Sequence, residues 1–273
     1  MRLSCLPVSF FSEIISGKMS VYEWASMGAF LKLDGVDLSI LFVPNRSLKE
    51  AACLRQEIES AGMRVAMLTT YPDFTHPRAA QREKELALEI EAVAIAEELG
   101  ADLVRVTAGQ AHPETEREHG IQWAIEGLNR LCEATKGSTT RLVYENHAKP
   151  GVWEHTDFSQ PPEIFLEIVR GTAEIGLGVN FDTGNAATFA DDPLALLDQV
   201  LERVVSVHAS DSRQKGKLEH VLLGTGVTPY QEMFTHLKQA NWDGWICMEE
   251  ASFSGIEGVR RAAEFIRRIW SGG

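Results

Sequence analysis

The stretch GWICMEEAS, residues 244–252, joins an apolar run directly to two carboxylates. The residues from Trp245 to Met248 are typical of a buried strand, and Glu249 and Glu250 follow them without a turn. Carboxylates are rarely fully buried unless a partner offsets their charge. The stretch therefore predicts a core strand whose end meets such a partner.

Short apolar runs of this kind recur along the chain and alternate with longer segments of helical period. The period is clear in residues 47–62, 81–100 and 117–135, and Gly100 stands where a helix C-cap glycine belongs. The candidate strands are residues 2–10, 36–43, 64–70, 102–108, 141–145, 176–182, 204–210 and 245–250. Strands that alternate with helices predict a parallel sheet joined by crossovers.

Eight strand–helix units predict a closed (β/α)8 TIM barrel, in which helices surround a parallel eight-stranded barrel. The alternative is an open doubly wound sheet, but no GxGxxG motif follows the first strand. The Gly-Thr-Gly sequence at 224–226 lacks the rest of that motif and is typical of a turn. No linker or low-complexity tract divides the chain, so we expect residues 1–273 to form a single domain.

Composition narrows the classes of function. The chain has 273 residues, 44% of them hydrophobic, and a formal net charge of −13. This charge argues against a nucleic-acid partner, because phosphate binding relies on Lys and Arg. Four scattered cysteines without a CxxC pair are typical of reduced thiols in a cytoplasmic protein. The sequence contains no convincing secretory signal and no apolar run of about 18 residues, so we expect no membrane span.

Four late strands end in side chains that can bind a metal ion. They are Glu145, Asp182, His208 and Glu249. Active sites of TIM barrels form at the C-terminal ends of the strands. Strand alternation puts these four in the phase with the smaller, more polar residues, while bulky residues such as Phe181 and Met248 suit the outer helices. The same alternation prefers Glu249 to Glu250.

A divalent cation at the barrel axis would offset the buried negative charge at these strand ends. Alone, Glu145 fits a rim ion pair, Asp182 an Asx turn and His208 a satisfied core histidine. Four consecutive strands that each deliver a ligand at the same end instead predict one metal site. Three carboxylates and one imidazole favour Mn²⁺ or Mg²⁺, and Co²⁺ and Zn²⁺ stay open.

The motifs YENH (144–147), NFDTGN (180–185), VHASD (207–211) and MEE (248–250) resemble the xylose isomerase-like TIM-barrel superfamily. The chain is most similar to its branch of sugar phosphate isomerases and epimerases. That branch includes hydroxypyruvate isomerase, D-tagatose 3-epimerase and inosose dehydratase, and endonuclease IV is more distant. The resemblance implies a single divalent metal held by the four side chains that strand alternation selects.

The resemblance also implies a mechanism for isomerase and epimerase members. Two glutamates face each other across the substrate carbon, and these roles fall to Glu145 and Glu249. One removes a proton next to a carbonyl and the other returns a proton, through a cis-enediolate, while the metal stabilises the developing oxyanion. A metal-bound carboxylate is a weak base, so the scheme also relies on the metal to acidify the substrate proton.

Two positions depart from the pattern of the superfamily, and both concern the substrate. Members often carry His three residues after the metal-binding Asp, where this chain has Asn185. Epimerases tend to place Arg shortly after the His ligand, and Arg213 lies in that loop. Residues 146–162 form a long connection, and long loops are often lids or binding loops. The candidate substrate contacts are Asn146, His147, Lys149, Trp153, Asn185 and Arg213.

The sequence thus predicts a metal-dependent isomerase or epimerase of a small sugar, keto-sugar or polyol. An inosose dehydratase-like lyase would use the same acid/base pair to expel water. A DNA-repair endonuclease on this fold would need extra metal ligands and a basic groove, and a non-catalytic binding barrel is the fourth alternative. Barrels of this kind often pair, so a homodimer or higher homo-oligomer stays open, as do the sugar and the native metal.

Overall fold

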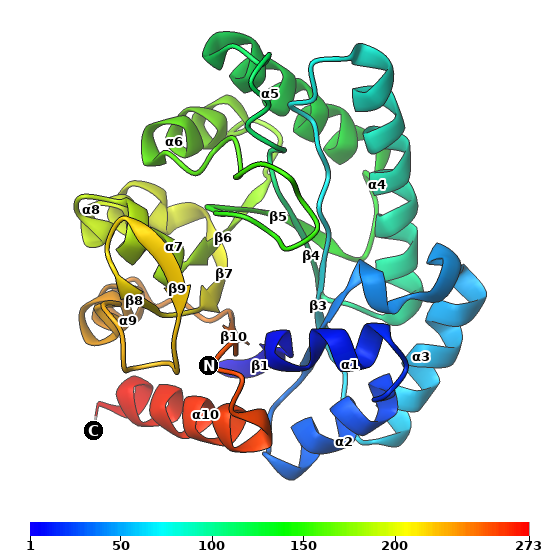
Figure 1. The fold of residues 1–273 in the computed structure, drawn as a ribbon, viewed down its shortest axis with the longest axis vertical. Helices are drawn as coiled ribbons and strands as arrows, with labels where there is room; N and C mark the ends of the chain where they lie inside the picture. Colours follow the sequence, from blue (N-terminus) through cyan, green and yellow to red (C-terminus); the bar gives the residue numbers. More distant parts are fainter. Residues whose placement is uncertain (273) are drawn as a thin grey trace.

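The computed structural model describes residues 1–272, and its eight parallel strands are surrounded by helices (Figure 1). The barrel strands are β1 (Arg2–Leu6), β2 (Val36–Ser39), β3 (Val65–Thr69), β4 (Leu103–Val106), β5 (Arg141–Glu145), β6 (Gly178–Asp182), β7 (Val204–Ala209) and β10 (Trp245–Glu249). They pair in the order β1-β10-β7-β6-β5-β4-β3-β2. The predicted (β/α)8 TIM barrel is confirmed.

The helices cover the outer face of the strands. Their bounds are α1 (Phe11–Ile15), α2 (Val21–Phe30), α3 (Leu48–Ser60), α4 (Ala79–Leu99), α5 (Arg117–Ala134), α6 (Pro162–Gly171), α7 (Thr183–Phe189), α8 (Pro193–Val200), α9 (Tyr230–Gln239) and α10 (Gly255–Ser271). Local sequence sets several of these ends: α2 begins with a capping box between Ser20 and Glu23. Gly100, the predicted C-cap of α4, adopts the left-handed conformation with φ 69°.

The barrel has its seam between β1 and β2, the first and last strands in the order of pairing. Asp34 N donates to Leu3 O at 2.8 Å, and the Asp34 carboxylate accepts from Leu3 N at 2.8 Å. One residue further along, Ser4 Oγ lies 2.8 Å from a carboxylate oxygen of the buried Asp37. A few specific contacts therefore close the sheet where its ladder ends.

Strand alternation separates an outer core from a smaller inner one. Phe181, Val207 and Met248 belong to the large cluster that packs with the helices. The inner cluster lies within the barrel and consists of Ala66, Met67, Leu103, Val143, Trp245 and Cys247. Alternation along residues 204–210 predicts that Val205 faces outward with Val207, but Val205 is half-buried and packs against the inner cluster. On β5 and β10, the residues that face the barrel interior are on the same face of the strand as Glu145 and Glu249.

Three elements differ from the predicted strands. The first strand ends at Leu6 because Pro7 has no N–H for the ladder, and the 3-10 helix η1 (Val8–Phe10) follows. The second ends at Ser39, whose hydroxyl accepts from Leu41 N at 3.2 Å and starts the 3-10 helix η2 (Ile40–Phe42). The antiparallel hairpin β8 (Ser212–Gln214) and β9 (Lys217–His220) follows β7 and has no counterpart in the predicted strands. In residues 1–272, every helix is too short or too polar to cross a membrane.

Candidate metal centre

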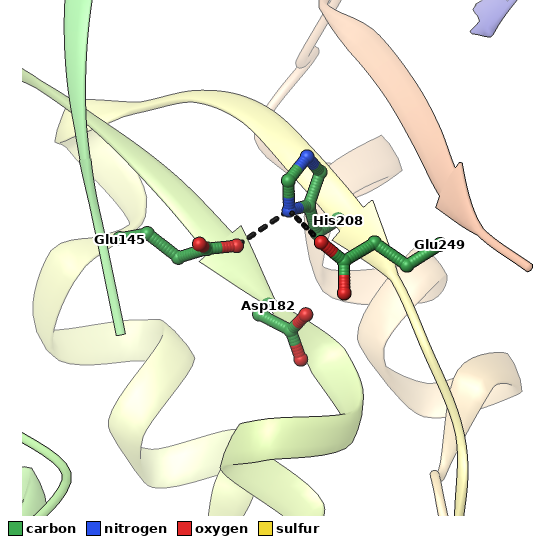
Figure 2. Close-up of side chains that lie close together, drawn as sticks. All are labelled: Glu145, Asp182, His208 and Glu249. Carbon is green, nitrogen blue, oxygen red and sulfur yellow. Dashed lines mark hydrogen bonds and ion pairs between the residues drawn. The ribbon is translucent and has the colours of Figure 1, made fainter. Parts of the chain in front are cut away.

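Four strand ends bring their side chains to one point inside the barrel (Figure 2). Each of β5, β6, β7 and β10 contributes one residue, and one possible ligand atom from each lies within 4.8 Å of the others. The residues are Glu145, Asp182, His208 and Glu249. The structure thus gathers the four side chains selected from the sequence, and Glu250 is outside this group.

His208 lies between the two glutamates. Its Nδ1 is 2.5 Å from Glu145 Oε1 and 3.2 Å from Glu249 Oε1. Both contacts are visible in Figure 2, where the carboxylates of Glu145 and Glu249 approach His208 from two sides. Glu145, Asp182 and His208 are fully buried, whereas the Glu249 side chain is 14% exposed. Glu249 is therefore the member of the group with the most access to solvent.

Several buried polar atoms of this group have no hydrogen-bond partner among the described residues. Asp182 Oδ2 is a buried acceptor without a donor, and His208 Nε2 also lacks a partner, while Glu145 Oε2 has an ion pair with Arg105 but no hydrogen bond. A buried carboxylate oxygen without a donor is costly, because desolvation is not offset. Oxygen-rich ligand sets with one imidazole suit a divalent cation. The donor set, together with the unpartnered Asp182 Oδ2 and His208 Nε2, fits a metal ion.

Electrostatics within the group also fit a cation. Burial works to raise the pKa of Glu145 and of Glu249, but His208 and Arg105 outweigh it and hold both pKa values below the usual range. Burial, with the nearby negative charges of Glu249 and Glu145, raises the pKa of Asp182 well above normal. Burial lowers the pKa of His208, yet the two glutamates raise it well above 6.5. A divalent ion would replace the proton on His208 as the counter-charge.

Neighbouring polar residues fix the ligand-capable side chains in place. Asn180 Nδ2 donates to Glu145 Oε1 at 2.9 Å, and Ser206 Oγ donates to Asn180 Oδ1 at 2.7 Å. Asp182 Oδ1 accepts from Ser210 Oγ at 2.8 Å and from the backbone N of Asn185 at 2.6 Å, as the N-cap of α7. Helix capping therefore sets the orientation of Asp182.

Two of the predicted substrate contacts, Asn146 and Asn185, also take part in this support. The Asn146 side chain donates to Asp182 O at 2.8 Å and accepts from Asp182 N at 2.7 Å, so it pairs with the backbone of the strand end. Asn185 Nδ2 donates to Asn146 O at 3.2 Å, and its Oδ1 is buried without a donor. Asn146 and Asn185 lie beside the centre, and their hydrogen bonds hold β5 and β6 together.

The other predicted substrate contacts lie in loops around the centre. The buried His147 packs edge-on against Trp153, with ring centroids 6.2 Å apart, and its Nδ1 is 3.5 Å from the Asp157 carboxylate. Lys149 is exposed, and its Nζ donates to Glu154 O at 2.7 Å within the same loop. Arg213 is 65% exposed on β8 and pairs with Glu219 at 3.1 Å. His147 and Trp153 are the members of this set held in the interior.

The long loop between β5 and α6 is anchored to its neighbour. Gln110 Oε1 accepts from the backbone N of Glu154 at 2.9 Å and of His155 at 3.1 Å, and Phe158 N donates to Gly109 O at 2.8 Å. Asp73 holds Gln110 in turn, since its carboxylate accepts from Gln110 N at 2.9 Å. In Figure 1 this green loop extends inward from the ring of helices. Hydrogen bonds therefore hold this loop in a defined position against the loop that follows β4.

The sequence did not predict the surroundings of two buried charged residues near the strand ends, Arg105 and Glu250. Arg105, within β4, is 1% exposed, and its Nε lies 3.0 Å from Glu145 Oε2. Glu250 is fully buried, where it accepts from Ser9 Oγ at 2.6 Å and from Ser252 N at 2.9 Å. An arginine inside the apolar run DLVRVTA was the available signal for the first residue. Arg105 is thus the cation of the described chain that contacts the candidate centre.

Comparison with known proteins identifies relatives by sequence and by fold. The chain is similar to an inosose dehydratase of Clostridium beijerinckii, with 23% identity over 280 residues that cover 91% of this chain and 89% of that protein. A structure of D-psicose 3-epimerase with D-tagatose from Clostridium cellulolyticum H10 has a TM-score of 0.79, with 13% identity and 99% of each chain covered. The IOLI protein with a bound zinc atom has a TM-score of 0.80 at 13% identity, with 100% of this chain and 99% of that chain covered.

At these identities the two solved structures establish a shared fold and nothing further. The family assignment comes from a sequence profile that matches residues 26–269, which is most of the chain. The chain belongs to the xylose isomerase-like TIM barrel family.

Proposed function

We propose that this protein is a metal-dependent enzyme that isomerises or epimerises a small sugar or a sugar-derived keto compound or polyol. The observation that carries the proposal is the convergence of four ligand-capable side chains at the ends of four barrel strands. Membership of the xylose isomerase-like TIM barrel family supports the proposal, as do the sequence similarity to an inosose dehydratase and the fold shared with a D-psicose 3-epimerase. Mn²⁺ or Mg²⁺ is the expected ion, given three carboxylates and one imidazole.

A bound divalent ion would supply Lewis-acid stabilisation of the oxyanion that develops on a substrate carbonyl. Glu145, Asp182, His208 and Glu249 would hold it. Asp182 and His208 would serve as ligands, because α7 capping and burial fix them. Glu145 and Glu249 would also move protons at the substrate carbon, since their carboxylates lie on two sides of His208 (Figure 2).

The substrate contacts proposed for this reaction are the loop residues around the centre. His147 and Trp153 form a buried edge-on pair in the loop that follows β5, and their rings suit contact with a small polar ligand. Lys149 and Arg213 are exposed and would reach a substrate only after their present partners, Glu154 O and Glu219, are released. We therefore rank His147 and Trp153 above Lys149 and Arg213.

A lyase that removes water is the second candidate, because the chain is similar to an inosose dehydratase over 91% of its length. The same two glutamates would then remove a proton and protonate a leaving hydroxyl. An isomerase conserves the mass of its substrate, whereas a dehydratase loses water.

The test is a screen of ketoses, hydroxyaldehydes and inosose in D₂O with added Mn²⁺, monitored by NMR and mass spectrometry. Deuterium at a carbon next to a carbonyl, without loss of water from the product, supports the isomerase or epimerase. A product lighter by one water supports the lyase. Reaction that proceeds equally well after EDTA treatment would contradict both.

A further inference from the structure

Arg105 is a buried cation in the barrel interior, next to the candidate ligand Glu145. Leu103 on β4 and Val143 on β5 belong to the inner cluster, and Arg105 and Glu145 lie two residues further along the same faces. Both side chains are buried, and Arg105 Nε is 3.0 Å from Glu145 Oε2. Long charged side chains are almost never fully buried unless they are paired.

The remaining contacts of Arg105 come from the first half of the barrel. Its Nη1 donates to Thr70 O at 2.8 Å. The guanidinium also lies over the Tyr71 ring, 5.0 Å from the ring centroid, a geometry that favours a cation. The side chain is thus held from β3 and its loop, independently of Glu145. The planar guanidinium keeps a fixed orientation toward the carboxylate.

The two oxygens of Glu145 have different surroundings as a result. Oε1 accepts from Asn180 Nδ2 at 2.9 Å and lies 2.5 Å from His208 Nδ1, on the side of the other ligand-capable residues. Oε2 faces Arg105 in an ion pair that lacks the alignment of a hydrogen bond. Glu249 has the His208 contact but no comparable ion pair to an Arg or Lys within the described chain.

We propose that Arg105 is a positioning residue and a built-in counter-cation of this centre, an inference that rests on the proposed metal-dependent function. It retains Glu145 Oε2 and leaves Oε1 for a metal ion. With His208 neutral, the three carboxylates carry three negative charges, and a divalent ion with Arg105 carries three positive charges. The loaded centre is then neutral, which minimises the desolvation cost of its burial.

The proposal predicts a specific link between Arg105 and metal-dependent stability. Arg105→Gln removes one positive charge from the buried group, so the metal-free protein loses more stability than the loaded protein. The rise in Tm on adding Mn²⁺ to EDTA-treated protein should be larger than in wild type, because a ligand stabilises the folded state according to its affinity. At pH 8, calorimetric titration should give Mn²⁺ binding at least about ten-fold tighter than wild type.

Arg203→Gln is the matched control. Arg203 is a partly buried arginine directly before β7, at the N-terminal end of the strand, and donates to the backbone carbonyls of Val169, Thr172 and Leu177. Its loss should lower Tm equally with and without Mn²⁺. Arg105→Lys keeps the charge, so its Mn²⁺-dependent rise should return toward that of wild type. If Arg105→Gln does not fold after EDTA treatment, the Mn²⁺-dependent rise in Tm and the Mn²⁺ affinity of Arg105→Lys still test whether the charge at this position matters.

Positioning has its own measurement, the electron paramagnetic resonance spectrum of bound Mn²⁺. Without Arg105, Glu145 can turn and bind through both oxygens, which changes the spectrum of Arg105→Gln but leaves that of Arg203→Gln unchanged. A Tm rise and a spectrum equal to those of wild type in Arg105→Gln would overturn the inference. Failure of wild type itself to bind Mn²⁺ would instead overturn the proposed function.

Discussion

The strands of the second half of the barrel and those of the first half end differently. The strands β5, β6, β7 and β10 carry Glu145, Asp182, His208 and Glu249, whereas β2, β3 and β4 end in Ser39, Thr69 and Val106. The first half nevertheless buries carboxyl groups, namely Asp37 on β2 and Glu89 on α4. Asp37 accepts from Ser4 Oγ, and Glu89 from Thr70 Oγ1.

The partners of these carboxyl groups explain the contrast. Burial raises the pKa of Asp37 and of Glu89 to about 7, because nearby charges and hydroxyl donors only partly offset desolvation. In the second half, His208 and Arg105 overcome the same desolvation and lower the pKa of Glu145 and Glu249. Burial thus favours the protonated acid at Asp37 and Glu89, and the ionised carboxylate at Glu145 and Glu249, which lie next to His208 and Arg105. Asp182 is the exception in the second half, because burial and the two neighbouring glutamates raise its pKa.

The largest expected effect is on turnover, when either glutamate of the candidate centre in the second half is replaced by its neutral amide. Glu145→Gln and Glu249→Gln should each lower turnover by roughly 10²–10⁴, because an amide keeps the size of the side chain but cannot accept the proton. Steady-state rates should be measured together with metal content, since both residues are also proposed ligands. Glu250→Gln is the control, because Glu250 is buried against Ser9 and Ser252. Greater loss from Glu250→Gln than from Glu249→Gln would invert the assigned strand phase.

The second prediction concerns the ion itself. Purified wild type should contain about one divalent ion per chain, and His208→Ala should lose most of it because the imidazole contacts both glutamates. Elemental analysis after dialysis measures this directly. Equal metal content in the two proteins would remove His208 from the ligand set.

The third prediction tests the first half of the barrel by the pH dependence of stability. The folded pKa of Asp37 lies above its ordinary value of 3.8, at about 7, so the folded state binds the proton more tightly. The stability contributed by this proton is complete below pH 4 and is lost as pH rises through about 7. The free energy of unfolding of Asp37→Asn should therefore rise relative to that of wild type as pH increases from 5 to 8, by up to about 4 kcal/mol.

Urea unfolding of both proteins in EDTA at several pH values measures this difference. Glu89→Gln provides a parallel case at a site away from the strand ends, with the same direction expected. A stability difference that stays constant from pH 5 to 8 would show that Asp37 is ionised in the folded protein and would end the contrast between the halves.

The smallest effect is expected for a residue that supports the second half indirectly. Asn185→Ala removes the side-chain bond to Asn146 O but leaves its backbone N–H on Asp182 Oδ1. Turnover should fall only several-fold, which corresponds to roughly the net free energy of one hydrogen bond, and the metal should be retained. Loss of the metal in this variant would place Asn185 among the residues that hold the ion.

Sequence alone predicted much of the fold because strands buried on both faces leave a strong apolar signal. The four strand ends could be grouped because alternation along β6, β7 and β10 separates polar from bulky residues. Arg105 was missed because an arginine in a short strand is normally solvent-exposed, and its pairing with Glu145 joins residues from different strands. The hairpin β8–β9 was missed because its strands are short and partly exposed, with no apolar period.

The role of Asn146 shows a further limit. An amide beside a predicted ligand suits substrate binding and backbone support equally well, since it donates and accepts. Its pairing with both the N–H and the carbonyl of Asp182 depends on the separation of β5 and β6, which the linear sequence does not contain.

The seam between β1 and β2 has a consequence for native-state hydrogen exchange. Local openings of a protein expose amides at a lower free energy than global unfolding where few backbone bonds must break. At the seam, Leu3 with Asp34 and Ser4 with Asp37 replace a regular ladder. The amides of β1 and β2 should therefore exchange earlier than those of β6 and β7. Since β1 pairs along its full length with β10, the same openings would reach the strand that carries Glu249.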